Sequence, residues 1–151
     1  MVNTTKKTLI LIAIASYALE ATSFAATIPA GTTLVLRTAQ GFSSIDAPGK
    51  EVRMELANDV TVGGKTVLRA GTKFNGRIVT SRRTHASKQR LSVNATSVQT
   101  ARGSVPIKTA GAVELKDTRL KTRRGTQVSG DSYLIPTGTK IEFRLTQPLN
   151  L

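Results

Sequence analysis

Apolar and polar positions alternate with a period of two along most of the chain after residue 25. The clearest case is the segment in which Ile141, Phe143 and Leu145 alternate with Glu142 and Arg144. This period is typical of a half-buried β-strand. The same alternation recurs around 34–37, 52–56, 74–80, 91–96 and 105–108. No window of a dozen residues after residue 25 shows a helical stripe, so the pattern predicts an all-β fold.

A phrase made of a turn, a Gly-Thr pair and a strand occurs three times. It reads IPAGTTLVLRT in Ile28–Thr38, LRAGTKFNGRI in Leu68–Ile78 and IPTGTKIEFRL in Ile135–Leu145. In the last copy Pro136 and Gly138 fit the second and fourth positions of a type I turn. Turn signals of this kind divide the chain into about seven to nine short strands. Such spacing predicts a small barrel or barrel-like sandwich.

Glycine also predicts a tight hairpin in the middle of the chain. Val60–Val62 and Lys65–Leu68 are joined by Gly63-Gly64, and glycine tolerates the positive φ angles of primed turns. The predicted core consists of the apolar members of the alternating segments. These are Leu34, Leu36, Val52, Met54, Leu56, Val67, Phe74, Ile78, Leu91, Val93, Val105, Ile107, Ile141, Phe143 and Leu145. We also expect the first and last strands to lie in one barrel, because exposed terminal strands would invite edge pairing.

The first 25 residues have the features of a secretory signal peptide. Lys6 and Lys7 precede an apolar run, Leu9–Ala15, and Ser23-Phe24-Ala25 supplies small residues before a cleavage site at Ala26. An uncleaved membrane anchor is the alternative, but a span needs about 20 apolar residues and Glu20 ends this run earlier. Residues 26–151 then form a single predicted domain. The chain has no cysteine, which excludes a lipid-modified lipoprotein.

Positive charge is concentrated in two segments. The formal charge of +13 becomes +12 when Lys6, Lys7 and Glu20 are removed with the signal peptide. Thr80–Lys88 is predicted to be a flexible loop, and 115–132 a basic loop or excursion that is long for a compact domain. Their cations are Arg82, Arg83, Lys88 and Arg90 in and just after the first, and Lys116, Arg119, Lys121, Arg123 and Arg124 in the second. These nine residues are the candidate anion-binding site; the alternative is that they only keep the protein soluble.

The residues indicate no catalytic or metal chemistry. His85 is the single histidine and lies in a polar basic segment. Asp46, Glu51, Glu55 and Asp59 form the one local group of acids, and Arg53 between two of them indicates a solvated, salt-bridged strand face. With no cysteine and one histidine, a zinc site lacks ligands. We therefore expect neither an enzyme nor a bound cofactor.

Several segments together resemble the C-terminal β-barrel domain of TrbI-type conjugal-transfer proteins, which are core-complex components of type IV secretion systems. The resemblance is carried by IPAGT, ELANDVTVGGKTVLRAGTKFNGRI, QRLSVNATSVQTARGSVPIKT and the terminal IPTGTKIEFRLTQPL. It covers about Ile28–Val113 and the last strand segment, and implies a barrel fold and an exported location. The family has an apolar helical pair late in the barrel. Here the charged segment 115–132 takes that place, and charge is costly in hydrocarbon, so a channel is not implied.

Two functions follow as hypotheses. The first is an exported, non-catalytic structural or assembly module of the bacterial cell envelope, periplasmic or associated with the outer membrane and related to secretion or conjugation. Its partner would be an envelope protein complex or another copy of the chain. The second is an anion-binding module that uses the two basic segments against lipopolysaccharide, a cell-wall polymer, DNA or a membrane surface.

Overall fold

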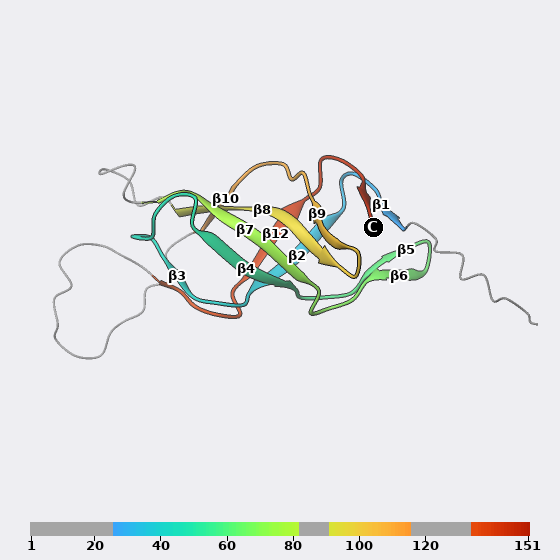
Figure 1. Cartoon of the computed structure of the whole chain (residues 1–151), viewed down its shortest axis with the longest axis horizontal. Coiled ribbons are helices and arrows are strands. Elements are labelled where there is room, and N and C mark those ends of the chain that lie inside the picture. Colours follow the sequence, from blue (N-terminus) through green and yellow to red (C-terminus); the bar gives the residue numbers. More distant parts are fainter. Residues whose placement is uncertain (1–25, 82–90, 116–133) are drawn as a thin grey trace, which may run out of the picture.

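The computed structural model describes residues 26–81, 91–115 and 134–151, and within them every regular element is a β-strand (Figure 1). Seven strands form the main antiparallel sheet, in the order β10–β8–β7–β4–β2–β12 with β9 also paired to β8. They are β2 (Thr33–Thr38), β4 (Glu51–Leu56), β7 (Lys73–Thr80), β8 (Leu91–Thr100), β9 (Gly103–Pro106), β10 (Val113–Leu115) and β12 (Lys140–Arg144). The predicted all-β, barrel-like fold is confirmed. No helix capable of spanning a membrane occurs in these three stretches.

Six shorter strands pair outside the main sheet. They are β1 (Thr27–Ile28) with β13 (Leu149–Asn150), β3 (Phe42–Ser43) with β11 (Leu134–Ile135), and β5 (Val60–Val62) with β6 (Lys65–Leu68). The described strands therefore outnumber the seven to nine expected, because a two-residue pairing is too short to show alternation. The predicted β5–β6 hairpin is confirmed: Gly63 and Gly64 have φ angles of 58° and 79°, as a primed turn requires.

The first and last parts of the described fold lie side by side. β12 pairs with β2, with Phe143 opposite Leu34 and Ile141 opposite Leu36. β1 pairs with β13, and the Leu151 N–H donates to the Ala26 carbonyl over 3.0 Å. The expectation that the terminal strands share one barrel is confirmed.

The sheet curls until its two edges approach each other. β10 contacts β12 at one end, and the connection that precedes β10 bonds directly to the end of β12. The Ala110 N–H donates to the Arg144 carbonyl, and the Thr146 N–H donates to the Lys108 carbonyl, each over 2.9 Å. These bonds satisfy edge groups that an open sheet would expose, and they give the sheet its barrel-like form.

The Gly-Thr phrase is a docking turn rather than the type I turn that we expected. Gly138 has a φ of 86° and the Thr139 N–H points back to the Pro136 carbonyl. The glycine thus occupies the third position of a type II turn, which requires positive φ. The Gly138 N–H donates to the Thr38 carbonyl (2.7 Å), and the Thr38 N–H donates to the Thr139 carbonyl (3.0 Å). The turn is thereby bonded at both sides to the end of β2.

The same pair of bonds occurs four times, once more than the sequence phrase indicated. Each glycine N–H donates to the carbonyl of a residue at or near the end of a neighbouring strand, and the N–H of that residue donates to the carbonyl of the residue after the glycine. The glycine and strand-end partners are Gly31 with Leu145, Gly49 with Ile78, Gly71 with Leu56, and Gly138 with Thr38. The Gly49 copy, Ala47-Pro48-Gly49-Lys50, was missed because lysine replaces threonine. β2–β12 and β4–β7 are therefore two strand pairs with such a turn at each end.

One hydrophobic cluster fills the interior. Thirteen of the fifteen predicted core residues are buried, and Val67 and Val105 are half-buried against the cluster instead. Eight buried apolar residues were not predicted, mostly in the short strands and at strand ends: Ile28, Phe42, Leu68, Ala95, Val98, Leu115, Ile135 and Leu149. The core prediction therefore holds for the main strands, where alternation is long enough to count.

Candidate functional site

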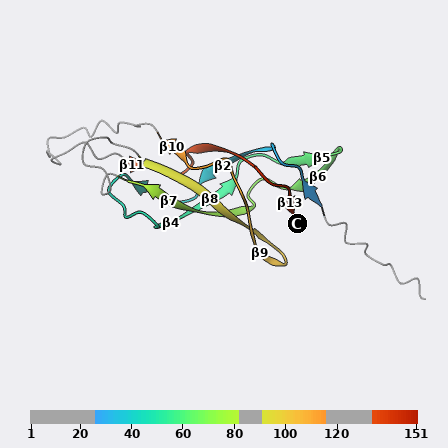
Figure 2. The same cartoon turned by 90° about the horizontal axis from the view of Figure 1, so that it is seen from above.

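The barrel has two ends with different contents. We call the hairpin end the one that carries the β5–β6 hairpin, the β8–β9 turn and the β1–β13 pair. We call the β3 end the opposite one, which carries the β3–β11 pair. Figure 1 shows the two ends at the right and left of the molecule, and Figure 2 shows the same division from above.

The nine cations predicted as an anion site, Arg82 to Arg90 and Lys116 to Arg124, lie outside the described residues, and so does His85. The residues that flank both segments are described. Thr80 is opposite Ser92, and Leu115 is opposite Leu91 on β8. Residues 82–90 and 116–133 are thus both joined to the barrel at the β3 end.

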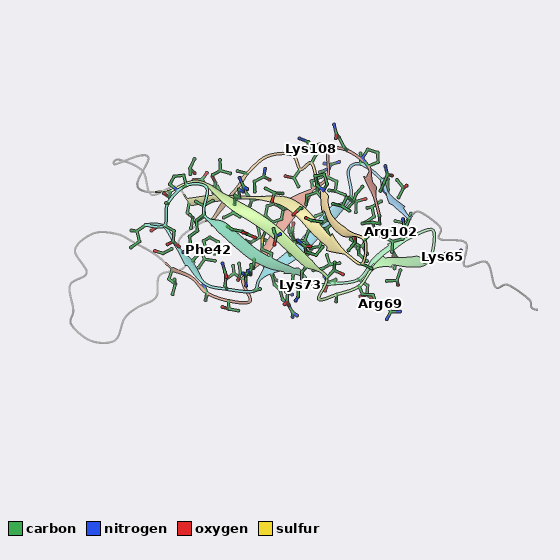
Figure 3. All side chains as sticks on the ribbon, in the orientation of Figure 1. Phe42, Lys65, Arg69, Lys73, Arg102 and Lys108 are labelled. Atoms are coloured by element: carbon green, nitrogen blue, oxygen red, sulfur yellow. The ribbon has the colours of Figure 1, made fainter. Side chains whose placement is uncertain are left out.

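The hairpin end carries a basic cluster, which we define as Lys65, Arg69 and Arg102. Lys65 follows the Gly63-Gly64 turn, Arg69 opens the turn before β7, and Arg102 lies in the turn between β8 and β9. All three side chains are exposed, and Figure 3 shows them gathered at this end of the barrel. Three segments that are distant in the sequence therefore place positive charge on one surface.

Hydroxyl groups hold the two turns that carry the arginines. The Arg69 carbonyl accepts from the Thr72 Oγ1 (2.6 Å) and the Thr72 N–H (3.1 Å). In the second turn the Thr100 Oγ1 donates to the Gly103 carbonyl (2.8 Å) and accepts from the Arg102 N–H (3.2 Å). Side-chain bonds of this kind fix the backbone of short turns, so the backbone positions of Arg69 and Arg102 are set by the fold.

The local charge balance at this end is positive. Among the described residues the nearby acid is Asp59, whose carboxylate accepts from the Ala70 N–H over 2.7 Å. Lys108 and Arg144 are exposed beside the segment that closes the sheet. A shallow hollow of about 340 Å³ lies between Arg69 and the β8–β9 turn, with Leu151 beside it. Of the basic cluster, Arg69 is the member that lines this hollow.

A second hollow lies next to the first on the outer face of β4, β7 and β8. Its volume is about 370 Å³; Arg53, Glu55 and Lys73 line it, and Gln99 lines both hollows. Glu55 lies opposite both Arg37 and Lys73 in the sheet and forms an ion pair with Arg37 at 3.1 Å. The predicted salt-bridged strand face is confirmed, although the partner of Glu55 is on β2 rather than Arg53.

The acids of the described residues are dispersed over the fold. In residues 26–81, 91–115 and 134–151 no three His, Cys, Asp or Glu side chains come together as metal ligands would. Asp46 is in an ion pair with Lys50 at 2.8 Å. The four acids of the sequence cluster are therefore separated. Asp46 and Glu55 are in different ion pairs, Asp59 accepts from a turn N–H, and Glu51 lies opposite Arg77.

Comparison with known proteins finds a likeness in structure and none in sequence. No protein-family model matches the chain, and no curated protein is significantly similar to it. The fold is similar to the structure of ComB10 of the Com type IV secretion system of Helicobacter pylori, with a TM-score of 0.52 and 13% identity. The likeness covers 81% of this chain and 88% of that chain. At this identity it shows a shared fold.

Proposed function

We propose that this protein is an exported, non-catalytic structural or assembly module of a bacterial cell envelope, related to type IV secretion or conjugation. The observation that carries the proposal is the fold shared with ComB10 over most of both chains. A fold alone does not define function. The independent resemblance of the Gly-Thr phrases to TrbI-type barrel domains, made from the sequence, adds support.

The proposal includes a location and a type of partner. The chain would be exported to the periplasm or the outer membrane after removal of residues 1–25. It would join an envelope protein complex or other copies of itself, and would do so without a cofactor. The docking turns and short paired strands support this role, because they provide a rigid barrel whose connecting segments are available for contacts.

The test is the size of the assembly in the producing cell. A chain with a small C-terminal tag, expressed at its native level, should be found in the envelope fraction in a particle much larger than one chain. Proteins of a secretion or conjugation apparatus should be purified with it after crosslinking. A monomer found alone in the soluble fraction would contradict the proposal. Phe143→Ala is a useful control, because a destabilised barrel should reduce co-purification.

A second candidate function is binding of an anionic polymer through Arg82, Arg83, Lys88, Arg90, Lys116, Arg119, Lys121, Arg123 and Arg124. The observation that favours it is the pairing of Leu91 with Leu115, which joins both segments to the same end of the barrel. Retention on heparin or lipopolysaccharide should then fall steeply with salt, because each released counterion contributes to the salt dependence. Glutamine at the four cations of the first segment should weaken retention, and unchanged retention would contradict this role.

A further inference from the structure

The hollow on the outer face of β4, β7 and β8 is a polar site that the proposed function does not use. We call it the outer hollow. Its lining includes two cations, one acid and three side-chain amides, which are Arg53 and Lys73, Glu55, and Gln40, Asn75 and Gln99. These residues belong to the segment after β2 and to three different strands, so only the folded sheet brings them together.

The acid of the outer hollow is already engaged, whereas Arg53 is not. Glu55 forms the ion pair with Arg37 at 3.1 Å and lies opposite Lys73 in the sheet. Arg53 lies opposite Asn75, a neutral residue. The Arg53 side chain is exposed and has no ion-pair partner among the described residues. Its guanidinium can therefore bind an anion from outside without breaking an existing pair.

The amides of the outer hollow are placed by the sheet. The Gln40 Nε2 donates to the Glu51 carbonyl over 3.3 Å. The Asn75 carbonyl accepts from the Thr96 Oγ1 over 3.1 Å, next to the register shift between β7 and β8. Such irregularities bend a strand and change the direction of its side chains. Within the described part of the chain the side-chain amides of Asn75 and Gln99 have no partner, so both can bind a ligand.

This combination of groups fits a peptide that carries one carboxylate. A guanidinium donates two parallel hydrogen bonds to a carboxylate, and a side-chain amide offers both the donor and the acceptor that match a peptide group. With two cations and one acid in its lining, the outer hollow has one positive charge in excess. We propose that the outer hollow binds a short acidic segment of another protein, with the carboxylate on Arg53 and the peptide backbone on the three amides.

Two other classes of anion fit the outer hollow less well. A phosphate dianion would bring a second negative charge close to Glu55, which lines the same hollow, and like charges repel. A single strand of nucleic acid binds to exposed aromatic rings by stacking. Phe42, Phe74 and Phe143 are all buried, so the described residues present no ring for this purpose.

The test uses the isolated protein and a defined probe. The probe is the peptide acetyl-Ala-Ala-Glu-Ala-Ala-amide, whose single carboxylate lies within a neutral backbone, and binding is followed by NMR of the side-chain N–H groups. Arg53→Gln removes the guanidinium, and Asn75→Ala removes an amide without changing the charge. Arg77→Gln is the matched control, because Arg77 is an exposed arginine on β7 that lies opposite Glu51 and does not line the hollow.

The expected results follow from the role of each group. The peptide should bind the wild-type protein and shift the side-chain resonances of Arg53, Asn75 and Gln99. Arg53→Gln should weaken binding about tenfold, the usual effect of losing a hydrogen bond to a charged group, and Asn75→Ala about threefold. Arg77→Gln should change binding by less than about twofold. Equal losses in the two arginine variants would overturn the proposal, since only net charge would then matter.

Two further probes test the carboxylate itself. The same peptide with glutamine in place of glutamate should bind at least about tenfold more weakly, and equal binding of the two peptides would overturn the proposal. Inorganic phosphate at constant ionic strength should compete poorly. Phosphate binding that is tighter than peptide binding and is lost in Arg53→Gln would identify a phosphate site instead. The result does not depend on the proposed secretion assembly, because the measurement requires only the isolated protein.

Discussion

The two ends of the barrel are built by the same turns and present different surfaces. Gly31 and Gly71 dock at the hairpin end, and Gly49 and Gly138 dock at the β3 end, with the same pair of backbone bonds. The hairpin end then carries a cationic surface. Among the described residues, the β3 end carries the Lys50–Asp46 ion pair and three exposed apolar side chains: Ile45, Val79 and Leu134. The docking turns join the strands in the same way at both ends. The side chains of the connecting segments determine what each end can contact.

The largest effect on stability is expected from a substitution in the core that both ends share. Phe143 is 1% exposed and faces Leu34 across the β2–β12 pair. Phe143→Ala should lower the free energy of unfolding by about 3–5 kcal/mol, the usual range for a core aromatic. Urea unfolding followed by circular dichroism measures this. A loss below about 1 kcal/mol would mean that the two ends are stabilised separately.

A substitution between the two ends should lower the free energy of unfolding by a smaller amount, through steric crowding. Gly76 lies where the β7–β8 register shifts, and a Cβ there would be 2.5 Å from the Met54 Cε and 2.6 Å from the Asn94 carbonyl oxygen. Gly76→Ala should therefore cost about 1–3 kcal/mol, the range for overpacking. Arg77→Ala on the same strand is exposed and is the control, with an expected change within about 0.5 kcal/mol. Equal effects would refute the close approach.

The turns themselves allow a direct comparison of the ends. Gly71 and Gly138 have φ angles of 85° and 86°, and a Cβ on either would meet no atom within 4 Å. Alanine at either position should lower the free energy of unfolding by about 1–2 kcal/mol, because its side chain disfavours the left-handed backbone conformation and meets no other atom. Thermal or urea unfolding of the two single variants should give the same value. A clear difference would show that the two turns are not equivalent.

The smallest effect is expected from the ion pair on the outer face between the ends. The side chains of Arg37 and Glu55 are 49% and 32% exposed, so solvent screens their attraction. A double-mutant cycle with Arg37→Ala and Glu55→Ala should give a coupling of less than about 1 kcal/mol. The coupling should decrease further in high salt. A larger, salt-insensitive value would indicate that the row of charges across β2, β4 and β7 is a structural network.

The sequence predicted the main strands well because their alternation is long. Leu34, Met54 and Phe74 each belong to strands of six or more residues, where a period of two can be counted. Ile28 and Leu149 lie in two-residue strands, whose burial depends on a partner distant in the sequence. The docking turn at Gly49 was not predicted, because Lys50 stands where the Gly-Thr phrase has threonine. The pair Pro48-Gly49 is nevertheless a type II turn signal.

The candidate site was harder to predict for a different reason. Charge counted along the sequence finds runs such as Arg123-Arg124, whereas Lys65, Arg69 and Arg102 are separate cations in three connections. Only the topology, which brings the β5–β6 hairpin and the β8–β9 turn to one end, places them on the same surface. A tertiary charge cluster of this kind leaves no local signal in the sequence.

The pairing of β2 with β12 also has a consequence for the order of events during folding. β2 can pair with β12 only when residues 140–144 are present. The bond from the Thr139 N–H to the Thr38 Oγ1 likewise joins positions 101 residues apart. Contacts of such long sequence separation form slowly, because loop closure precedes them. A chain that is synthesised from its N-terminus therefore cannot close its barrel until the last strands are present.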